Sequence, residues 1–256
     1  MSDLHVTEWG DGDRIVLVHG SLGAGVETWT AQRPLASNYR LVVVDRRGFG
    51  DSPPGHGDFD RDARDVAELL EAGDHVVGHS YGAVVALLAA ARRPQFVRSL
   101  TVIEPPALGL VRGRPEVEEF IERVDAARRE AVDAPDYVVR FRRAFGARVE
   151  RRVLAGRELK AANASWQERA PTEATIPLAE LAAAPFRTLV VRGAWDVASS
   201  DAQRIARPAL HAVCDVLVER LGADAATLPG AGHAAQLSPA FNERLRAFLD
   251  ASSPSG

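Results

Sequence analysis

Residues 75–90 read HVVGHSYGAVVALLAA. The first five, His75–His79, form a short apolar run that is typical of a buried strand. Ala83–Ala91 is apolar on every side, which predicts a helix buried all round that ends before Pro94. Only a tight turn fits between the two. This stretch therefore predicts a strand, a sharp turn and a helix, with Ser80 at the tip of the turn.

The two glycines of this turn have a physical role. A serine at the tip is held in a strained backbone conformation, and side chains at Gly78 or Gly82 would collide with the adjoining strand and helix. The turn lifts the Ser80 hydroxyl clear and aims the positive end of the following helix at it. A G-x-S-x-G pattern alone is weak in a chain with 21 glycines. The strand before it and the helix after it make Ser80 the favoured nucleophile.

Further short apolar runs alternate with helix-like segments, the pattern of βαβ units around a mostly parallel sheet. Asp60–Ala72 has one apolar face and is expected to be a helix, with Asp60 or Asp62 as its cap and Gly73 at its end. A long amphipathic helix is expected around Asp201–Leu221. Strands are expected at Leu4–Trp9, Arg14–His19, Arg40–Asp45, His75–His79, Val97–Ile103, Arg187–Arg192 and near Ala225–Leu228.

Residues 107–184 lack the strand pattern and carry helical, charge-rich sequence broken by proline and glycine. We interpret them as a helical lid inserted into an α/β core of residues 1–106 and 185–256. The arginine-rich run at 140–152 is typical of a solvated face. The lid aromatics either line a pocket or hold its helices together, and packing is favoured; they are Phe120, Tyr137, Phe141, Phe145 and Trp166.

A serine hydroxyl needs a base within hydrogen-bond reach, usually a histidine. His233 lies in a glycine-rich loop just after the last expected strand, at the strand ends where α/β active sites gather. Asp196 follows the strand Arg187–Arg192 and is the favoured carboxylate for orienting the base. Glu104, at the end of the strand Val97–Ile103, is the alternative acid.

The loop after the second expected strand reads HGSL (residues 19–22). It is expected to complete an oxyanion hole, in which the backbone N–H of Ser21 or Leu22 joins that of Tyr81. His19 is expected to hold this loop by a hydrogen bond.

Composition limits the classes of protein. The chain has 256 residues, of which 46% are hydrophobic and 26% charged, with a formal net charge of −4. These values suit one large globular α/β unit and give no reason to expect a nucleic-acid partner. Cys214 is the only cysteine, which excludes an intrachain disulfide and a cysteine-based metal site. No apolar stretch approaches the roughly 18 to 20 residues of a membrane span, and no leader is recognisable, so we expect a cytoplasmic protein.

The chain resembles the α/β-hydrolase superfamily over nearly its full length, because five sequence landmarks occur in the order typical of that family. That resemblance implies an eight-stranded, mostly parallel sheet, a helical lid, a small-molecule substrate in a pocket between lid and sheet, and no metal or organic cofactor. Serine at the turn differs from the aspartate of haloalkane dehalogenases and epoxide hydrolases. The landmarks are His19-Gly20, the loop DRRGFGDS (45–52), GHSYG (78–82), Gly193 with Asp196, and Gly232-His233.

The expected function is hydrolysis of a small ester, thioester or lactone through an acyl-enzyme. Ser80 would attack, His233 would carry the proton, and Asp196 would orient the imidazole. A carbon-carbon bond hydrolase with the same triad is the first alternative, and perhydrolases and cofactor-independent oxygenases also resemble this pattern. A non-catalytic ligand receptor on the same fold is the alternative from another class. The sequence makes no prediction of oligomeric state.

Overall fold

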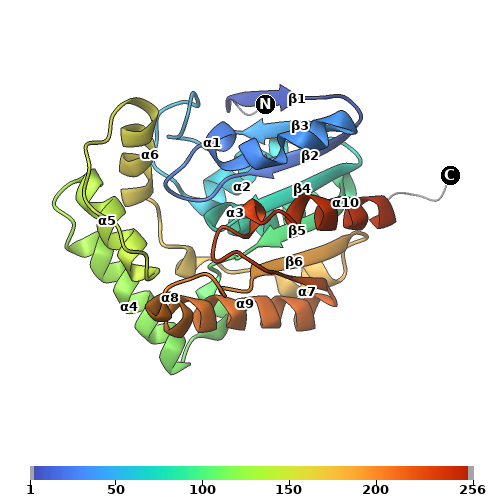
Figure 1. The fold of residues 1–256 in the computed structure, drawn as a ribbon. Helices are drawn as coiled ribbons and strands as arrows, with labels where there is room; N and C mark the ends of the chain where they lie inside the picture. The colour runs from blue at the N-terminus through green and yellow to red at the C-terminus, as the bar shows by residue number, and fades with distance from the viewer. Residues whose placement is uncertain (1–2, 253–256) are drawn as a thin grey trace.

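The computed structural model describes residues 3–252, and its centre is a single seven-stranded sheet (Figure 1). The strand order is β1-β3-β2-β4-β5-β6-β7, with β1 antiparallel to β3 and all other pairs parallel. The strands are β1 Val6–Trp9, β2 Asp13–Val18, β3 Tyr39–Val44, β4 Asp74–His79, β5 Val97–Ile103, β6 Arg187–Gly193 and β7 Asp224–Leu228.

The α/β-hydrolase fold is confirmed, and each of the seven expected apolar runs forms a strand. The eighth strand implied by the resemblance is absent from residues 3–252. The physical reason lies in the sequence, which contains no eighth apolar run of strand length outside the helices.

Helices cover both faces of the sheet. None of those in the described residues is long and apolar enough to cross a membrane. Their bounds are α1 Gly25–Trp29, α2 Phe59–Leu69, α3 Tyr81–Arg92, α4 Pro115–Arg129, α5 Ala134–Ala144, α6 Gly156–Trp166, α7 Leu178–Ala182, α8 Ser200–Arg204, α9 Ala206–Leu221 and α10 Phe241–Ser252, with 3-10 segments η1 Thr30–Ser37, η2 Pro94–Phe96, η3 Leu108–Val111, η4 Pro171–Glu173 and η5 Ala235–Leu237.

Alternation along the strands divides the apolar side chains between two cores. In β2, Val16 and Val18 join the core under α2, α3 and α9, while Ile15 and Leu17 join the core under η1 and α10. Successive side chains of a strand point to opposite faces, so a parallel sheet covered on both sides reads as a continuous apolar run. These two cores fix the ends of the strands, where the site lies.

Helix α3 is buried along almost its whole length, as its sequence predicts. Every residue from Tyr81 to Ala90 is buried. The helix contacts α2, β4 and β5. It begins two residues before the expected start, directly after Ser80, and ends at Arg92.

Two details of the helices differ from the sequence-based predictions. The cap of α2 is Asp58, whose side chain accepts hydrogen bonds from the backbone N–H groups of the second and third helical residues. Asp60 and Asp62 lie inside the helix, because it begins one residue earlier than expected, at Phe59. The helix expected around 201–221 is broken between α8 and α9, since Pro208 lacks the N–H that would continue the hydrogen-bond ladder.

The segment between β5 and β6 forms a helical insertion that contains α4, α5 and α6. These helices lie beyond one end of the sheet (Figure 1). An ion-pair cluster joins the insertion to the core: the buried Arg46 guanidinium contacts Glu168 Oε1 at 2.6 Å and Asp62 Oδ2 at 2.8 Å. The guanidinium also lies over the rings of Phe49 and Tyr81. Because all three charged groups are buried, breaking one contact would leave an uncompensated charge.

Candidate active site

Ser80 occupies the strained turn that its sequence predicts. Its backbone has φ 54° and ψ −124°, a conformation that L-residues rarely adopt. A Cβ atom at Gly78 would lie 2.3 Å from the Gly82 carbonyl oxygen, and one at Gly82 would lie 2.3 Å from the Val18 oxygen. The Ser80 N–H donates to the Ile103 oxygen at 2.8 Å, which ties the turn to β5. Only glycine therefore fits at the positions two residues before and two residues after this serine.

The imidazole of His233 lies beside the Ser80 hydroxyl, with 2.8 Å between Nε2 and Oγ. His233 follows β7, and its carbonyl oxygen accepts a hydrogen bond of 3.0 Å from His79 Nε2. Burial lowers the pKa of His233 to about 4, so the imidazole is neutral at pH 7. A neutral imidazole with its proton on Nδ1 can accept the serine proton at Nε2.

Glu104 presents a carboxylate to the other side of the same imidazole. It follows β5 directly, is fully buried, and has φ 48°. Its Oε1 accepts hydrogen bonds from Gly193 N at 2.8 Å and from the Trp195 indole N–H at 3.0 Å. Its Oε2 lies 3.7 Å from His233 Nδ1, and neither atom has a hydrogen-bond partner among the described residues. Burial raises the pKa of Glu104 to about 7, although the two N–H donors act to lower it.

Asp196 takes a different position. It is exposed, and both of its carboxylate oxygens accept from the Gly230 N–H, at 3.0 and 3.2 Å. Within residues 3–252 it makes no hydrogen bond or ion pair with His233. Asp196 thus links the loops after β6 and β7, whereas Ser80, His233 and Glu104 lie in one line of polar contacts. Both acids directly follow a strand, so their places in the sequence do not distinguish them.

The loop of residues 19–22 packs against the serine, since a Cβ at Gly20 would lie 2.9 Å from Ser80 Cβ. The Leu22 N–H already donates to Ser165 Oγ at 2.8 Å. The Ser21 N–H has no partner among the residues that the structure describes. Tyr81 is the first residue of α3, where N–H groups lack an acceptor within the helix. Of the donors expected from the sequence, Ser21 and Tyr81 are therefore free to bind an oxyanion.

Hydrogen bonds from buried side chains fix this loop. His19 Nδ1 donates to the Gly20 oxygen at 2.7 Å, and its Nε2 accepts from the Arg46 N–H at 3.0 Å. Burial lowers the pKa of His19 well below its usual range. The Ser21 hydroxyl donates to Glu168 Oε2 at 2.5 Å. Glu168 was not identified from the sequence, where a lone glutamate in the insertion carries no recognisable motif.

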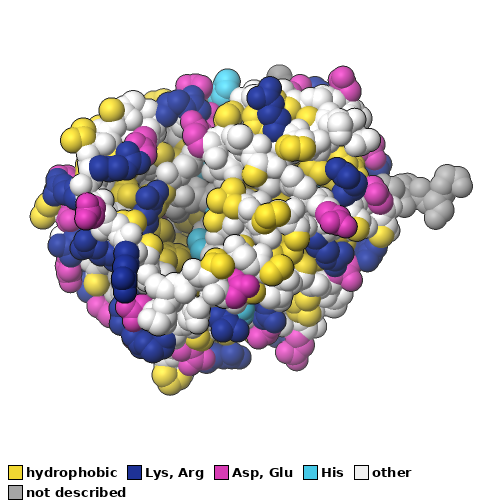
Figure 2. All heavy atoms as spheres, in the orientation of Figure 1, with side chains coloured by type: hydrophobic (Ala, Val, Ile, Leu, Met, Phe, Trp, Pro, Cys, Tyr) yellow, Lys and Arg dark blue, Asp and Glu magenta, His cyan; other side chains and the backbone are white. Residues whose placement is uncertain are grey.

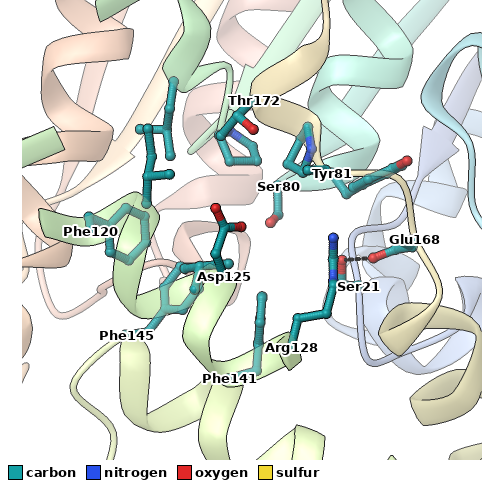
Figure 3. A pocket seen from close by; sticks show the side chains of 16 residues that line it. Ser21, Ser80, Tyr81, Phe120, Asp125, Arg128, Phe141, Phe145, Glu168 and Thr172 are labelled. Atoms are coloured by element: carbon teal, nitrogen blue, oxygen red, sulfur yellow. Dashed lines mark hydrogen bonds between the residues drawn. The ribbon is translucent and has the colours of Figure 1, made fainter. Parts of the chain in front are cut away.

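Two spaces meet at Ser80. The first is a narrow cavity of about 40 Å³ between the sheet and the insertion, lined mainly by apolar side chains (Figure 3). The second is a wider hollow of about 320 Å³ that reaches the surface between the insertion and the rest of the molecule (Figure 2). His79 and His233 line the hollow and not the cavity.

The aromatic side chains of the insertion divide between the two roles considered for them. Phe120, Phe141 and Phe145 line the narrow cavity. Phe145 also lies against His233, with 4.7 Å between the ring centroids. Tyr137 and Trp166 stack on each other at 6.4 Å and hold helices of the insertion together. The insertion therefore covers His233 as well as Ser80.

Among residues 3–252, one group of side chains has the spacing of metal ligands. One atom from each of His5, Asp45 and Asp51 lies within 4.8 Å of the others. Arg157 forms ion pairs with both aspartates, and the Gly25 N–H donates to Asp45 Oδ1. These carboxylates already have cationic and N–H partners and serve to hold the loop after β3.

Comparison with known proteins agrees with this architecture. The model of the alpha/beta hydrolase family matches residues 15–244. Pimeloyl-[acyl-carrier protein] methyl ester esterase from Shewanella woodyi is 36% identical over 102 residues, which span 40% of each chain. The chain thus covers about two fifths of that relative's length.

Two solved structures resemble the whole chain. An alpha/beta hydrolase from Sphaerobacter thermophilus is 25% identical, with a TM-score of 0.70 over 96% of both chains. A thermophilic esterase from Thermogutta terrifontis is 22% identical, with a TM-score of 0.65 over 97% of this chain and 90% of that chain. With most of its length matched by the family model, the chain belongs to the alpha/beta hydrolase family.

Proposed function

We propose that the chain is a serine hydrolase that cleaves a small carboxylic ester, thioester or lactone through an acyl-enzyme. The observation that carries the proposal is the 2.8 Å contact between Ser80 Oγ and His233 Nε2 at the tip of a strained turn. The names of the Shewanella and Thermogutta relatives, both esterases, favour the same bond type.

In the proposed first step, Ser80 Oγ attacks the carbonyl carbon while its proton moves to His233 Nε2. The carbonyl π electrons move onto oxygen, where the N–H groups of Ser21 and Tyr81 would stabilise the negative charge. When the tetrahedral intermediate collapses, the bond to the leaving group breaks and the leaving atom takes the proton from His233. Water then repeats the sequence on the acyl-enzyme, and releases the acid and free Ser80.

We propose Glu104, rather than the Asp196 favoured by the sequence, as the carboxylate that orients His233. Proton transfer to Nε2 leaves a positive imidazolium that needs an anion near Nδ1, and Glu104 Oε2 is 3.7 Å away. That distance is slightly longer than a hydrogen bond, and such contacts often tighten only in the complex with substrate. The second carboxylate oxygen is held by Gly193 and Trp195, which fixes the direction of the first.

A fluorophosphonate probe followed by intact-mass spectrometry tests the nucleophile. We expect one adduct, mapped to Ser80, and turnover of p-nitrophenyl acetate that the adduct abolishes. Hydrolysis that continues after complete labelling would contradict the proposed nucleophile. Labelling without turnover of any ester, thioester or lactone would instead support a non-catalytic receptor on this fold.

The pH dependence of kcat/KM tests the proposed acid. Burial holds the pKa of Glu104 at about 7 and that of His233 at about 4, so the productive state, with Glu104 ionised and His233 neutral, predominates only above pH 7. We expect kcat/KM for p-nitrophenyl acetate to rise between pH 5 and 8 and then level off. Activity that is constant down to pH 5 would show that no group with a pKa near 7 is needed, and would contradict an orienting acid with the raised pKa of Glu104.

A further inference from the structure

The narrow cavity beside Ser80 contains two charged side chains from one turn of α4. Asp125 and Arg128 both line it, three residues apart on the helix, and both point into the space in front of Ser80 (Figure 3). The rest of the lining is mostly apolar. Charged groups are costly in such surroundings unless a partner compensates them.

The Arg128 guanidinium lacks that partner in the part of the chain that the structure describes. No carboxylate lies within 4.0 Å of it, and its Nε is buried without a hydrogen-bond acceptor. Two arginines near it in the insertion do have carboxylate partners: Arg129 pairs with Glu122, and Arg140 pairs with Glu130 and Asp136. Glu168 also lines the cavity, but its charge is compensated by Arg46. Arg128 is thus a cation of the cavity lining that lacks a carboxylate partner, and its polar side-chain neighbour is the Tyr137 hydroxyl.

The positions of the two spaces decide which part of a substrate meets Arg128. His233 must return its proton to the leaving atom, so the leaving group lies on the His233 side of Ser80. His233 lines the open hollow and not the narrow cavity. The leaving group therefore belongs in the hollow, and the acyl chain extends into the cavity toward α4.

We propose that Arg128 binds a carboxylate at the far end of the acyl chain, so that the preferred substrates are half-esters, or the corresponding thioesters, of short dicarboxylic acids. This assignment rests on the proposed hydrolase function and adds the substrate class. A guanidinium offers paired N–H donors that match the two oxygens of a carboxylate. Asp125 repels the same carboxylate and limits the affinity.

Two methyl esters with a five-carbon acyl chain test this assignment. Monomethyl glutarate carries the terminal carboxylate, whereas methyl pentanoate ends in a methyl group, and both release methanol. We expect Arg128→Gln to lower kcat/KM for monomethyl glutarate by about 10- to 100-fold, while methyl pentanoate changes by less than about threefold. Asp125→Asn should raise kcat/KM for monomethyl glutarate severalfold, because it removes a like charge.

Arg129→Gln is the matched control, because Arg129 is adjacent in sequence, exposed and outside the cavity lining. It should leave both esters unaffected. An equal loss on both esters in Arg128→Gln would overturn the proposal, since that is the result of a merely structural arginine. Unchanged hydrolysis of monomethyl glutarate in Arg128→Gln would overturn it too.

Failure of the hydrolase proposal would be recognised separately, as wild-type protein that neither reacts with fluorophosphonate nor turns over p-nitrophenyl acetate. The anion site would then be tested by calorimetric titration of monomethyl glutarate into wild type and Arg128→Gln. Binding that is weakened about tenfold or more in the variant would support the site, and equal binding or none would overturn it.

Discussion

Ser80→Ala is expected to lower kcat for p-nitrophenyl acetate by about four to six orders of magnitude. The proposed nucleophile is removed, and only water activated by His233 remains to attack the carbonyl. The residual rate comes from the N–H groups of Ser21 and Tyr81, which still stabilise the oxyanion. Steady-state kinetics with protein purified free of other esterases measures the loss.

The fold of that variant should stay intact. Alanine removes one oxygen, and its methyl group occupies the space of the serine Cβ. The strained φ of 54° remains, so a thermal melt should differ little from that of wild type. Ser37→Ala, at an exposed serine of η1, is the matched control and should keep full activity. A folded Ser80→Ala protein with most of its activity would refute the acyl-enzyme mechanism.

The second large effect is expected at Glu104. In Glu104→Gln the amide oxygen can still accept from Gly193 and Trp195, which places the NH₂ group opposite His233 Nδ1. That donor favours the tautomer with its proton on Nε2, which cannot accept the Ser80 proton. We expect kcat to fall by about 10³- to 10⁴-fold, as for other triads in which an amide replaces the acid. Asp196→Asn should cost less than about tenfold, because among residues 3–252 the Asp196 carboxylate accepts hydrogen bonds only from the Gly230 N–H.

Glu104→Gln should also be more stable than wild type at pH 8. Burial raises the pKa of Glu104 from 4.5 to about 7 in the folded chain, so the folded state holds a proton that the unfolded state has lost between these values. The free energy of unfolding therefore falls as pH rises from 4.5 to 7. Above pH 7 the folded protein bears the full cost of holding an ionised Glu104 in a buried place. This cost of ionising Glu104 in the folded protein is about 3 kcal/mol, and the Glu104→Gln variant avoids it because glutamine does not ionise.

Kinetics and thermal melts of Glu104→Gln at pH 5 and pH 8 check the expected loss of activity and the expected gain in stability together. The gain in stability should appear at pH 8 and shrink toward pH 5. If Asp196→Asn lost more activity than Glu104→Gln, the sequence-based choice of acid would be the correct one. If Glu104→Gln were inactive but less stable at pH 8, its effect would be structural.

Much of the fold is predictable from local sequence. The run before Ser80 and the apolar helix after it define a strand, a turn and a buried helix, and the structure has all three. Strands joined by helices favour parallel pairing, which the structure has from β2 to β7, but they do not determine the order of the strands in the sheet. The break before α9 was missed, although Pro208 was visible, because its effect depends on where the preceding helix starts.

The candidate site is less readable from sequence because its decisive contacts are distant along the chain. The sequence suggests His233 as the partner of Ser80 because both lie in recognisable glycine-rich loops, and the two side chains lie 2.8 Å apart in the structure. The two acids each follow a strand, and only the folded backbone distinguishes the buried Glu104 from the exposed Asp196. Arg128 went unnoticed among many arginines, since its lack of a partner is a property of the packed insertion.

The backbone distortions of the molecule bear on how it could be engineered. Within residues 3–252, the non-glycine residues with positive φ are Leu22, Ser80, Glu104 and Trp195, and each belongs to the site or holds a residue that does. Such conformations cost roughly 1 to 3 kcal/mol each, so glycine at the small Ser80 is a route to a more heat-resistant protein, whereas at the buried Trp195 the lost packing would outweigh the relieved strain. A selection for heat resistance that ignores turnover would therefore favour glycine at Ser80, and would yield a more stable protein without its proposed nucleophile.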